Sequence, residues 1–242
     1  MKARKAVLFA AVAFYALLWV GGIVSYWLLD GPPGDAQWTA PVFLLLAGIL
    51  ALASLQAKDV ARTLAAAAVG LLAEFAGVHT RFPFGEYQYT TTLQPLLLGV
   101  PVVMICAWLV LIAYVQAHLA SVRVFGWKRL VLGALWLTAI DLVIDPLAAG
   151  PLNYWRWTHP GWYYGIPWTN FAGWLLVSYV ALAVAGRSTS PARSSQAIGL
   201  SIVLFFALTA LANEQYLASI IGFLLCALDV VRTRSTRALA PD

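Results

Sequence analysis

Residues 6–29 read AVLFAAVAFYALLWVGGIVSYWLL, an apolar stretch without a charged side chain. A helix crosses the hydrocarbon core of a bilayer with about 20 apolar residues, so this stretch predicts a transmembrane helix. It is longer than the apolar core of a signal peptide, and no small-residue cleavage site precedes Asp30. We therefore expect this helix to be retained in the mature protein.

Most of the chain has the same character. Further apolar stretches lie at 40–57, 60–78, 95–117, 130–149 and 167–185. Residues 197–231 are too long for one crossing at 1.5 Å per residue, and the polar trio at 213–215 divides them in two. Of the 242 residues 62% are hydrophobic and 10% charged, with a mean hydropathy of +0.82, whereas soluble domains have about 25% charged residues. The sequence predicts an all-α polytopic transmembrane bundle of about eight helices, with residues 1–242 as a single domain.

The basic residues predict the orientation of this bundle. With a cytoplasmic N-terminus, eight crossings place all but Arg81 and Arg156 of the 15 lysines and arginines in the cytoplasm, as the positive-inside rule prefers. Seven crossings would place the Arg-rich C-terminal tail outside. We therefore expect both termini to be cytoplasmic in a multi-pass protein of the cell membrane. The basic residues form short clusters between apolar stretches, which is not the footprint of a nucleic-acid-binding protein.

Acidic side chains inside the predicted spans mark the chemistry, because a charge there is costly unless it faces a cavity or a partner. Glu74 and Asp145 lie four or five residues from the outer ends of two outward-running helices, so both lie about 6–8 Å below the outer boundary. Asp141 precedes Asp145 by four residues, and both therefore share one helical face. This spacing predicts that three carboxyl groups line one pocket.

A structural interpretation of the same acids remains open at this point. Each acid could cap a loop or pair with Arg81 or Arg156. That interpretation is weaker for the three acids together, since two stacked carboxyls in apolar surroundings do not both stay charged. A carboxyl that keeps its proton at neutral pH is what a general acid requires. Asp229 lies near the cytoplasmic end of its helix, where we interpret it as an interfacial acid paired with Arg232.

Two predicted outer loops, at 79–94 and 150–166, are dense in aromatic residues. Their rings, with one just beyond the second loop, are Phe82, Phe84, Tyr87, Tyr89, Trp155, Trp157, Trp162, Tyr163, Tyr164 and Trp168. An interfacial aromatic belt accounts for many such residues in any membrane protein. Aromatic faces can also stabilise a developing carbocation and exclude water from it. The residues alone leave both interpretations open.

Several other chemistries lose support. The chain has only three histidines, too few for a membrane di-iron site, and it has no glycine-rich nucleotide-binding fingerprint. A metal site formed by His79, His159 and the acids would have few nitrogen ligands. Cys106 and Cys226 lie in apolar stretches and predict neither a disulfide nor a thiolate site. We expect no metal and no cofactor.

Two stretches resemble a known family. They are residues 74–101, EFAGVHTRFPFGEYQYTTTLQPLLLGVP, and residues 141–174, DLVIDPLAAGPLNYWRWTHPGWYYGIPWTNFAGW. The matching motifs are PFGxYxY at 83–89, GVP at 99–101, DP at 145–146, WxW at 155–157 and YYGxPxxNFxGW at 163–174. In combination they are specific, and they resemble polytopic carotenoid-biosynthesis membrane proteins. Characterised members of that family are carotenoid hydratases, such as γ-carotene 1′,2′-hydratase and bisanhydrobacterioruberin hydratase. Arg81 departs from the pattern, which commonly has Gly there.

The resemblance implies that water is added to the terminal isoprenoid double bond of an acyclic carotenoid, giving a tertiary alcohol. Asp145 is expected to protonate the alkene, with Glu74 or Asp141 as its partner that deprotonates the water. The residues expected to contact the substrate are Phe84, Tyr87, Tyr89, Trp155, Trp157, Tyr163, Tyr164, Asn170 and Trp174. The expected partners are the lipophilic carotenoid, membrane lipid and other carotenoid-pathway enzymes.

Two other functions remain as alternatives. A carotenoid end-group cyclase begins with the same protonation, but a neighbouring double bond then captures the cation. A transporter or a scaffold would bind isoprenoids without altering them, and a transporter needs a polar path that reaches the cytoplasmic side. The predicted cytoplasmic halves of the helices carry almost no polar groups, which disfavours transport.

Overall fold

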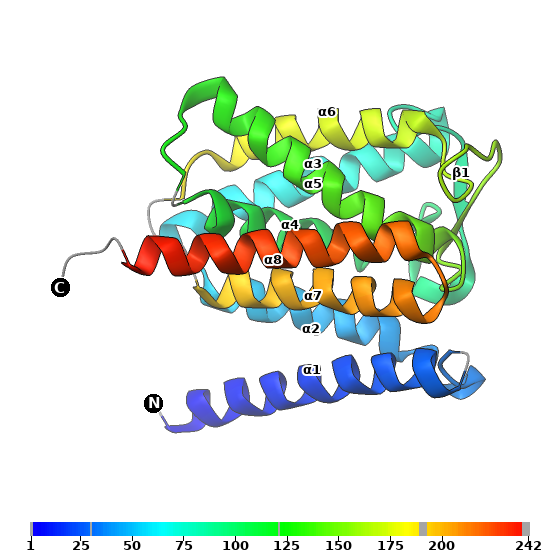
Figure 1. Ribbon diagram of the computed structural model, residues 1–242, viewed down its shortest axis with the longest axis horizontal. Coiled ribbons are helices and arrows are strands. Elements are labelled where there is room, and N and C mark those ends of the chain that lie inside the picture. Colours follow the sequence, from blue (N-terminus) through cyan, green and yellow to red (C-terminus); the bar gives the residue numbers. More distant parts are fainter. Residues whose placement is uncertain (1, 30, 121, 189–192, 239–242) are drawn as a thin grey trace.

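The computed structural model describes residues 2–29, 31–120, 122–188 and 193–238, and eight α-helices occupy most of them (Figure 1). The helices are α1 (Lys2–Leu28), α2 (Thr39–Ser54), α3 (Ala57–Thr80), α4 (Met104–Leu119), α5 (Gly126–Ala149), α6 (Trp168–Ala185), α7 (Arg193–Ala212) and α8 (Tyr216–Ala238). Two short 3-10 helices, η1 (Gly34–Ala36) and η2 (Thr91–Leu93), lie in the connections. Seven of the α-helices are long and apolar enough to cross a membrane. The predicted all-α transmembrane bundle is confirmed.

The start of α1 and the end of α8 lie at the same end of the bundle, which we call the terminal end (Figure 1). The opposite end carries residues 81–103 and 150–167, and we call it the loop end. Residues 213–215 separate α7 from α8, so the predicted division of the last apolar stretch is confirmed. Both termini at one end fit an even number of crossings. Which end faces the cytoplasm stays a prediction from the charges.

Helix α4 differs from the prediction, which began it at residue 95. Residues 96–101 instead form a small antiparallel hairpin of β2 (Leu96–Leu97) and β3 (Val100–Pro101). Pro95 and Pro101 lack the backbone N–H that a helix interior uses, and Gly99 between them has a φ of 82°. The apolar composition of this segment therefore concealed a turn.

The remaining 16 residues of α4 are about 24 Å long, less than the roughly 30 Å of a bilayer core. Helices α2, α3, α5, α6 and α7 all pack against it, and most of its side chains are buried. Small residues allow this close approach. A Cβ at Gly70 of α3 would lie 2.1 Å from the Trp108 ring, and one at Gly199 of α7 would lie 2.3 Å from Tyr114. Helix α4 is thus the central element of the bundle.

The two aromatic loops meet at the loop end. Strand β1 (Tyr87–Tyr89) of the first pairs antiparallel with β4 (Trp155–Trp157) of the second, with Tyr87 opposite Trp157 and Tyr89 opposite Trp155. Because side chains alternate along a strand, these four rings lie on one face of the pair. The pairing brings the two sequence motifs together above the ends of α3 and α5.

The helices carry polar groups at the terminal end, where almost none was expected from the sequence. Asp229 is buried there, and Gln196 Nε2 donates to its Oδ2 at 3.0 Å. Asp229 also pairs with Nδ1 of His118, while Arg232 Nη1 donates to Nε2 of His118 at 2.9 Å. The predicted partner Arg232 thus reaches Asp229 through His118. These contacts join α4, α7 and α8.

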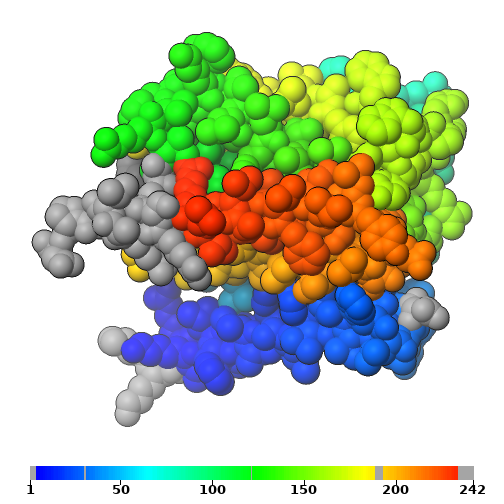
Figure 2. Space-filling model, viewed as in Figure 1, coloured from blue at the N-terminus to red at the C-terminus, as the bar shows by residue number. Residues whose placement is uncertain are grey.

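Helix α1 lies along one edge of the bundle and packs mainly against α2 and α7 (Figures 1 and 2). Only 6% of its apolar span is buried, compared with 50% for α5. Most of its side chains are therefore available to lipid or to a lipophilic ligand.

Candidate active site

Glu74 lies in α3, six residues before its end at the loop end, and is 4% exposed. Its Oε2 accepts hydrogen bonds from the hydroxyls of Tyr87 at 2.6 Å and Tyr89 at 2.9 Å. Its Oε1 accepts from Trp108 Nε1 of α4 at 3.1 Å. Three neutral donors from two elements therefore hold this carboxyl.

Asp141 and Asp145 lie one turn apart on α5, and each is 1% exposed. Asn170, in the first turn of α6, donates its Nδ2 to Asp141 Oδ2 at 2.8 Å and to Asp145 Oδ2 at 2.7 Å. The other oxygen of Asp145 accepts from Trp155 Nε1 at 2.6 Å. A single amide thus bridges the two aspartates, and strand β4 supplies the remaining donor.

Glu74 and Asp145 face one small cavity of about 20 Å³. The other lining residues are Phe84, Tyr87, Tyr89, Met104, Trp155, Trp157, Asn170 and Trp174. A cavity needs about 10–15 Å³ to hold one buried water, so this cavity has room for little more than one water molecule. Asp141 does not line it and lies one turn deeper, behind Asn170. An alkene end group can enter only if the aromatic walls move.

No basic side chain of the described residues pairs with these acids. Arg81 Nε lies 3.3 Å from Glu86 Oε2, and Arg156 Nε donates to Asn153 Oδ1 at 3.0 Å. The alternative that these arginines neutralise the acids is therefore wrong. The acids depend on neutral hydrogen-bond donors in an aromatic setting.

The tyrosine donors keep their protons. Burial, followed by the nearby Glu74 carboxyl, raises the pKa of both Tyr87 and Tyr89 well above the usual value. Their hydroxyls therefore remain donors throughout the neutral and moderately alkaline range. The alternation in YQY at 87–89 places both on the same face of β1.

Two predicted substrate contacts lie away from the cavity. Tyr163 donates its hydroxyl to the backbone oxygen of Leu142 at 2.8 Å, so it supports α5 from the outside. Tyr164 is 41% exposed, and its hydroxyl accepts from the backbone N of Leu217 at 3.2 Å. The structure brings the other seven predicted contact residues together with Glu74 and Asp145, because all of them line the cavity.

Residues 39–229, from the start of α2 into α8, match the family described as carotenoid biosynthesis protein. The chain belongs to this family. The match contains all three clustered acids and leaves out α1.

Bisanhydrobacterioruberin hydratase of Haloarcula japonica is 36% identical to the chain over 118 residues, which are 45% of this chain and 38% of that relative. The match therefore spans well under half of the relative's length. No solved structure matches the chain. Family membership and this relative support a carotenoid-modifying enzyme.

The residue that departs from the family motif has a structural explanation. Arg81 ends α3 in the left-handed conformation with a φ of 67°, and its backbone N–H bonds to the oxygen of Gly77 at 2.8 Å. Glycine adopts this conformation without steric penalty. Arg81 thus keeps the turn that a glycine would make, and its side chain gains an exposed ion pair with Glu86.

Two members of this carotenoid biosynthesis protein's site were not predicted. Trp108 donates to Glu74 and stacks on Trp174 with ring centroids 4.5 Å apart, and Met104 lines the cavity. Both lie in an apolar stretch, where Trp and Met are ordinary packing residues. The structure shows that Gly70 of α3 leaves room for the Trp108 ring.

The described residues contain no group of three His, Cys, Asp or Glu side chains placed to hold a metal ion. Asp141, Asp145 and Glu74 are instead separated by hydrogen-bond donors. What this cluster offers is proton donors and acceptors facing aromatic rings.

Proposed function

We propose that this carotenoid biosynthesis protein is a carotenoid hydratase. It adds water to the terminal isoprenoid double bond of an acyclic carotenoid end group by acid catalysis. The observation that carries the proposal is the pair of Glu74 and Asp145, which line one aromatic cavity and accept hydrogen bonds from neutral donors among the described residues. The reaction leaves the overall oxidation level unchanged, so it requires no redox cofactor.

The hydrogen bonds suggest different roles for the two carboxyls. Asp145 shares the Asn170 amide with Asp141, and two such neighbours in apolar surroundings retain at least one proton between them. Asp145 lines the cavity and Asp141 does not, so we assign Asp145 as the acid. Glu74 accepts three hydrogen bonds, which stabilise its carboxylate form against the cost of burial, so we assign it as the base.

In the proposed reaction the Asp145 proton passes to the less substituted carbon of the trisubstituted alkene. The π electrons form the new C–H bond and leave a tertiary cation. Water then forms a C–O bond to that cation, and Glu74 takes the proton that the water loses. A later proton exchange from Glu74 to Asp145 restores both groups.

Aromatic rings around the cavity suit the cation. Trp stabilises a positive charge most strongly when the charge lies within about 6 Å of the ring centroid, and Trp155, Trp157 and Trp174 all line the cavity. The hydroxyls of Tyr87 and Tyr89 and the Asn170 amide provide polar positions for one water. This combination favours capture of the cation by water over capture by a second double bond.

The test is expression in a lycopene-producing host grown in heavy-oxygen water, with the pigments separated by HPLC and weighed by mass spectrometry. We expect a product heavier by one molecule of labelled water. A product of unchanged mass with a new retention time would indicate cyclisation. Recovery of lycopene alone, with the protein present in the membrane, would contradict an enzymatic role on this substrate.

Matched variants assign the activity to the site. Asp145→Asn is expected to abolish the product while the protein stays folded. Asp59→Asn is the control, since Asp59 is also buried but lies at the terminal end, where Ser188 donates to it at 2.9 Å. Retained activity in Asp145→Asn would remove Asp145 from the acid role.

A further inference from the structure

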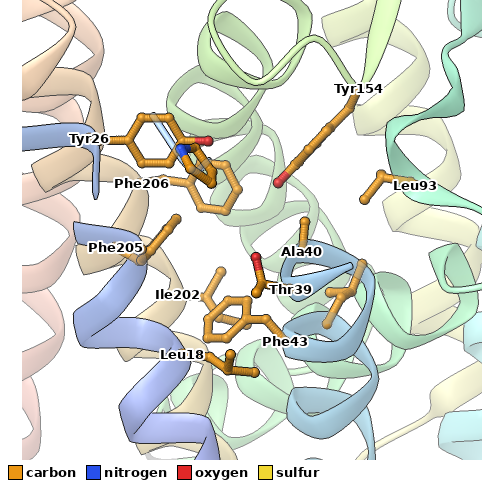
Figure 3. Close-up of a pocket in the computed structure, with 13 residues that line it drawn as sticks. Leu18, Tyr26, Thr39, Ala40, Phe43, Leu93, Tyr154, Ile202, Phe205 and Phe206 are labelled. Carbon is orange, nitrogen blue, oxygen red and sulfur yellow. The ribbon is translucent and has the colours of Figure 1, made fainter. Parts of the chain in front are cut away.

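The contact surface between α1 and the α2–α7 pair contains two cavities. The one toward the terminal end measures about 490 Å³, with Leu8, Val12, Tyr15 and Ile198 among its lining residues. The one toward the loop end measures about 90 Å³ and lies among Leu18, Phe43, Ile202 and Phe205 (Figure 3). We call the two cavities and the surface between them the α1 groove.

Aromatic side chains lie between the two cavities. Tyr15 lines the first and stacks on Phe43 of the second, with ring centroids 4.8 Å apart. From Leu8 to Tyr26 the groove follows α1 for about 27 Å, close to the roughly 30 Å hydrocarbon thickness of a bilayer. The groove therefore has the length and direction of a rigid lipophilic chain that spans the membrane.

The loop end of the α1 groove adjoins the acid cluster. Tyr154 and Leu93 close the groove there. The ring of Tyr154 lies 6.3 Å from that of Trp155, which donates to Asp145. Leu93 packs in one apolar cluster with Met104, which lines the acid cavity. Tyr154 and Leu93 thus form a wall between the groove and the residues that line the acid cavity.

Figure 3 shows the hydroxyls of Tyr26 and Tyr154 directed into the groove near this wall. The middle of the groove, in contrast, is lined by Leu18, Phe43, Ile202 and Phe205. Tyr15, Ser54, Ser194 and Ser201 bring hydroxyls to the cavity toward the terminal end as well, so the α1 groove has polar groups near both of its ends. The hydroxyls of Tyr26 and Tyr154 lie where an end group that becomes an alcohol would pass.

We propose that the α1 groove binds the polyene chain of an acyclic carotenoid lengthwise, with one end group passing Tyr154 and Leu93 to reach Asp145 and Glu74. This inference rests on the proposed function and names the binding site of its substrate. A conjugated chain is straight and planar, so it loses little conformational freedom in a straight groove. Stacking on aromatic walls adds to its binding. A saturated acyl chain has many rotatable bonds and gains neither advantage.

The groove also accounts for selection of the end group. Because the chain lies along the helices, it presents one terminus at a time to the acids. A ring at that terminus would have to pass the wall at Tyr154 and Leu93, whereas an open-chain end is narrow. We therefore expect carotenoids that are cyclised at both ends to bind poorly.

The experiment compares Leu18→Trp with Leu17→Trp in the purified protein in phospholipid nanodiscs. Leu18 lines the groove, whereas its neighbour Leu17 is 65% exposed on another face of the same helix. Lycopene is the probe, and binding is measured as extracted pigment per protein in the Asp145→Asn background, so that it cannot be consumed. We expect at least tenfold weaker binding with Leu18→Trp and no change with Leu17→Trp.

Turnover separates this inference from the proposed function. If Leu18→Trp lowers binding but the wild type forms no water adduct, the groove stands and the hydratase proposal fails. If the wild type hydrates lycopene and Leu18→Trp leaves KM unchanged, the groove is refuted and the hydratase proposal stands. Absence of both binding and product in the wild type refutes both.

A measurement on the wild type guards against misfolding of the variant. An acyclic isoprenoid carrying a photoreactive diazirine is added to the nanodiscs, and the labelled peptides are identified by mass spectrometry. Adducts on α1, α2 and α7 support the groove. Adducts confined to other helices, or displaced by phospholipid but not by lycopene, overturn it.

Discussion

Replacing Glu74 by Gln removes the proposed base and changes few atoms. The wild-type carboxyl accepts from Tyr87, Tyr89 and Trp108. A Trp N–H can only donate, so the Gln oxygen must face Trp108 and the new NH₂ must face the tyrosines. Tyrosine hydroxyls can also accept, so both can turn to receive the amide protons. The free energy of unfolding should therefore fall by less than about 2 kcal/mol.

The effect on hydration should be much larger. An amide does not accept the proton that the attacking water loses, and a positioned base contributes about 100- to 10,000-fold to a rate. This range corresponds to about 2.7–5.4 kcal/mol in the activation barrier. The assay is initial water-adduct formation from lycopene in nanodiscs, followed by HPLC with mass detection.

Thermal unfolding of the same preparation separates the two effects. A melting temperature close to the wild-type value with activity reduced 100-fold or more supports the assignment. Activity within threefold of the wild type would refute Glu74 as the base. Equal losses of activity and of folded protein would show that Glu74 serves stability instead.

Three further predictions concern the surroundings of the site. Asn170→Ala removes the donor shared by Asp141 and Asp145 and leaves a buried acceptor unsatisfied on each, which costs about 1–3 kcal/mol per acceptor. Thermal melting should show this loss, and product formation should fall with it; unchanged melting would contradict the bridge. Arg81→Gly relieves a left-handed backbone at a non-glycine residue but loses an exposed ion pair. Denaturation should therefore show a free energy of unfolding between unchanged and about 1 kcal/mol higher. A decrease of more than about 1 kcal/mol would contradict the turn argument. Burial and the Glu74 carboxyl raise the pKa of Tyr87 above the usual value of 10.0, so the folded state retains a proton that the unfolded chain releases. The contribution of Tyr87 to stability should therefore be constant up to about pH 9 and fall as the pH rises above about 10. A Tyr87→Phe variant should show a smaller fall in its melting curves over that pH range.

The helices could be predicted from the sequence because apolar length alone specifies them in a membrane. The start of α4 could not, since residues 95–103 are as apolar as a helix, yet two prolines and Gly99 turn the chain. At the site, the common depth of Glu74 and Asp145 followed from counting residues along two helices. Which donors hold them depends on how strands β1 and β4 pair, and no local pattern specifies that.

The polar groups at the terminal end escaped prediction for a different reason. His118 and Asp229 are 111 positions apart in the chain, and each looks isolated within its own helix. Their pairing requires α4 and α8 to be adjacent. Trp108 and His118 are about 15 Å apart along α4, and between them lie buried apolar residues such as Val110 and Ile112. Within the described residues, the two polar clusters of this helix are therefore insulated from each other.

The pairing of β1 with β4 has a mechanical consequence for catalysis. Tyr89 serves Glu74 and Trp155 serves Asp145, and these two donors lie directly opposite each other in the ribbon. A displacement of the ribbon that admits an end group must carry both donors with it. Asp145 and Glu74 should therefore lose and regain these hydrogen bonds together. Both carboxyls are then positioned for the reaction only when the ribbon is back in place.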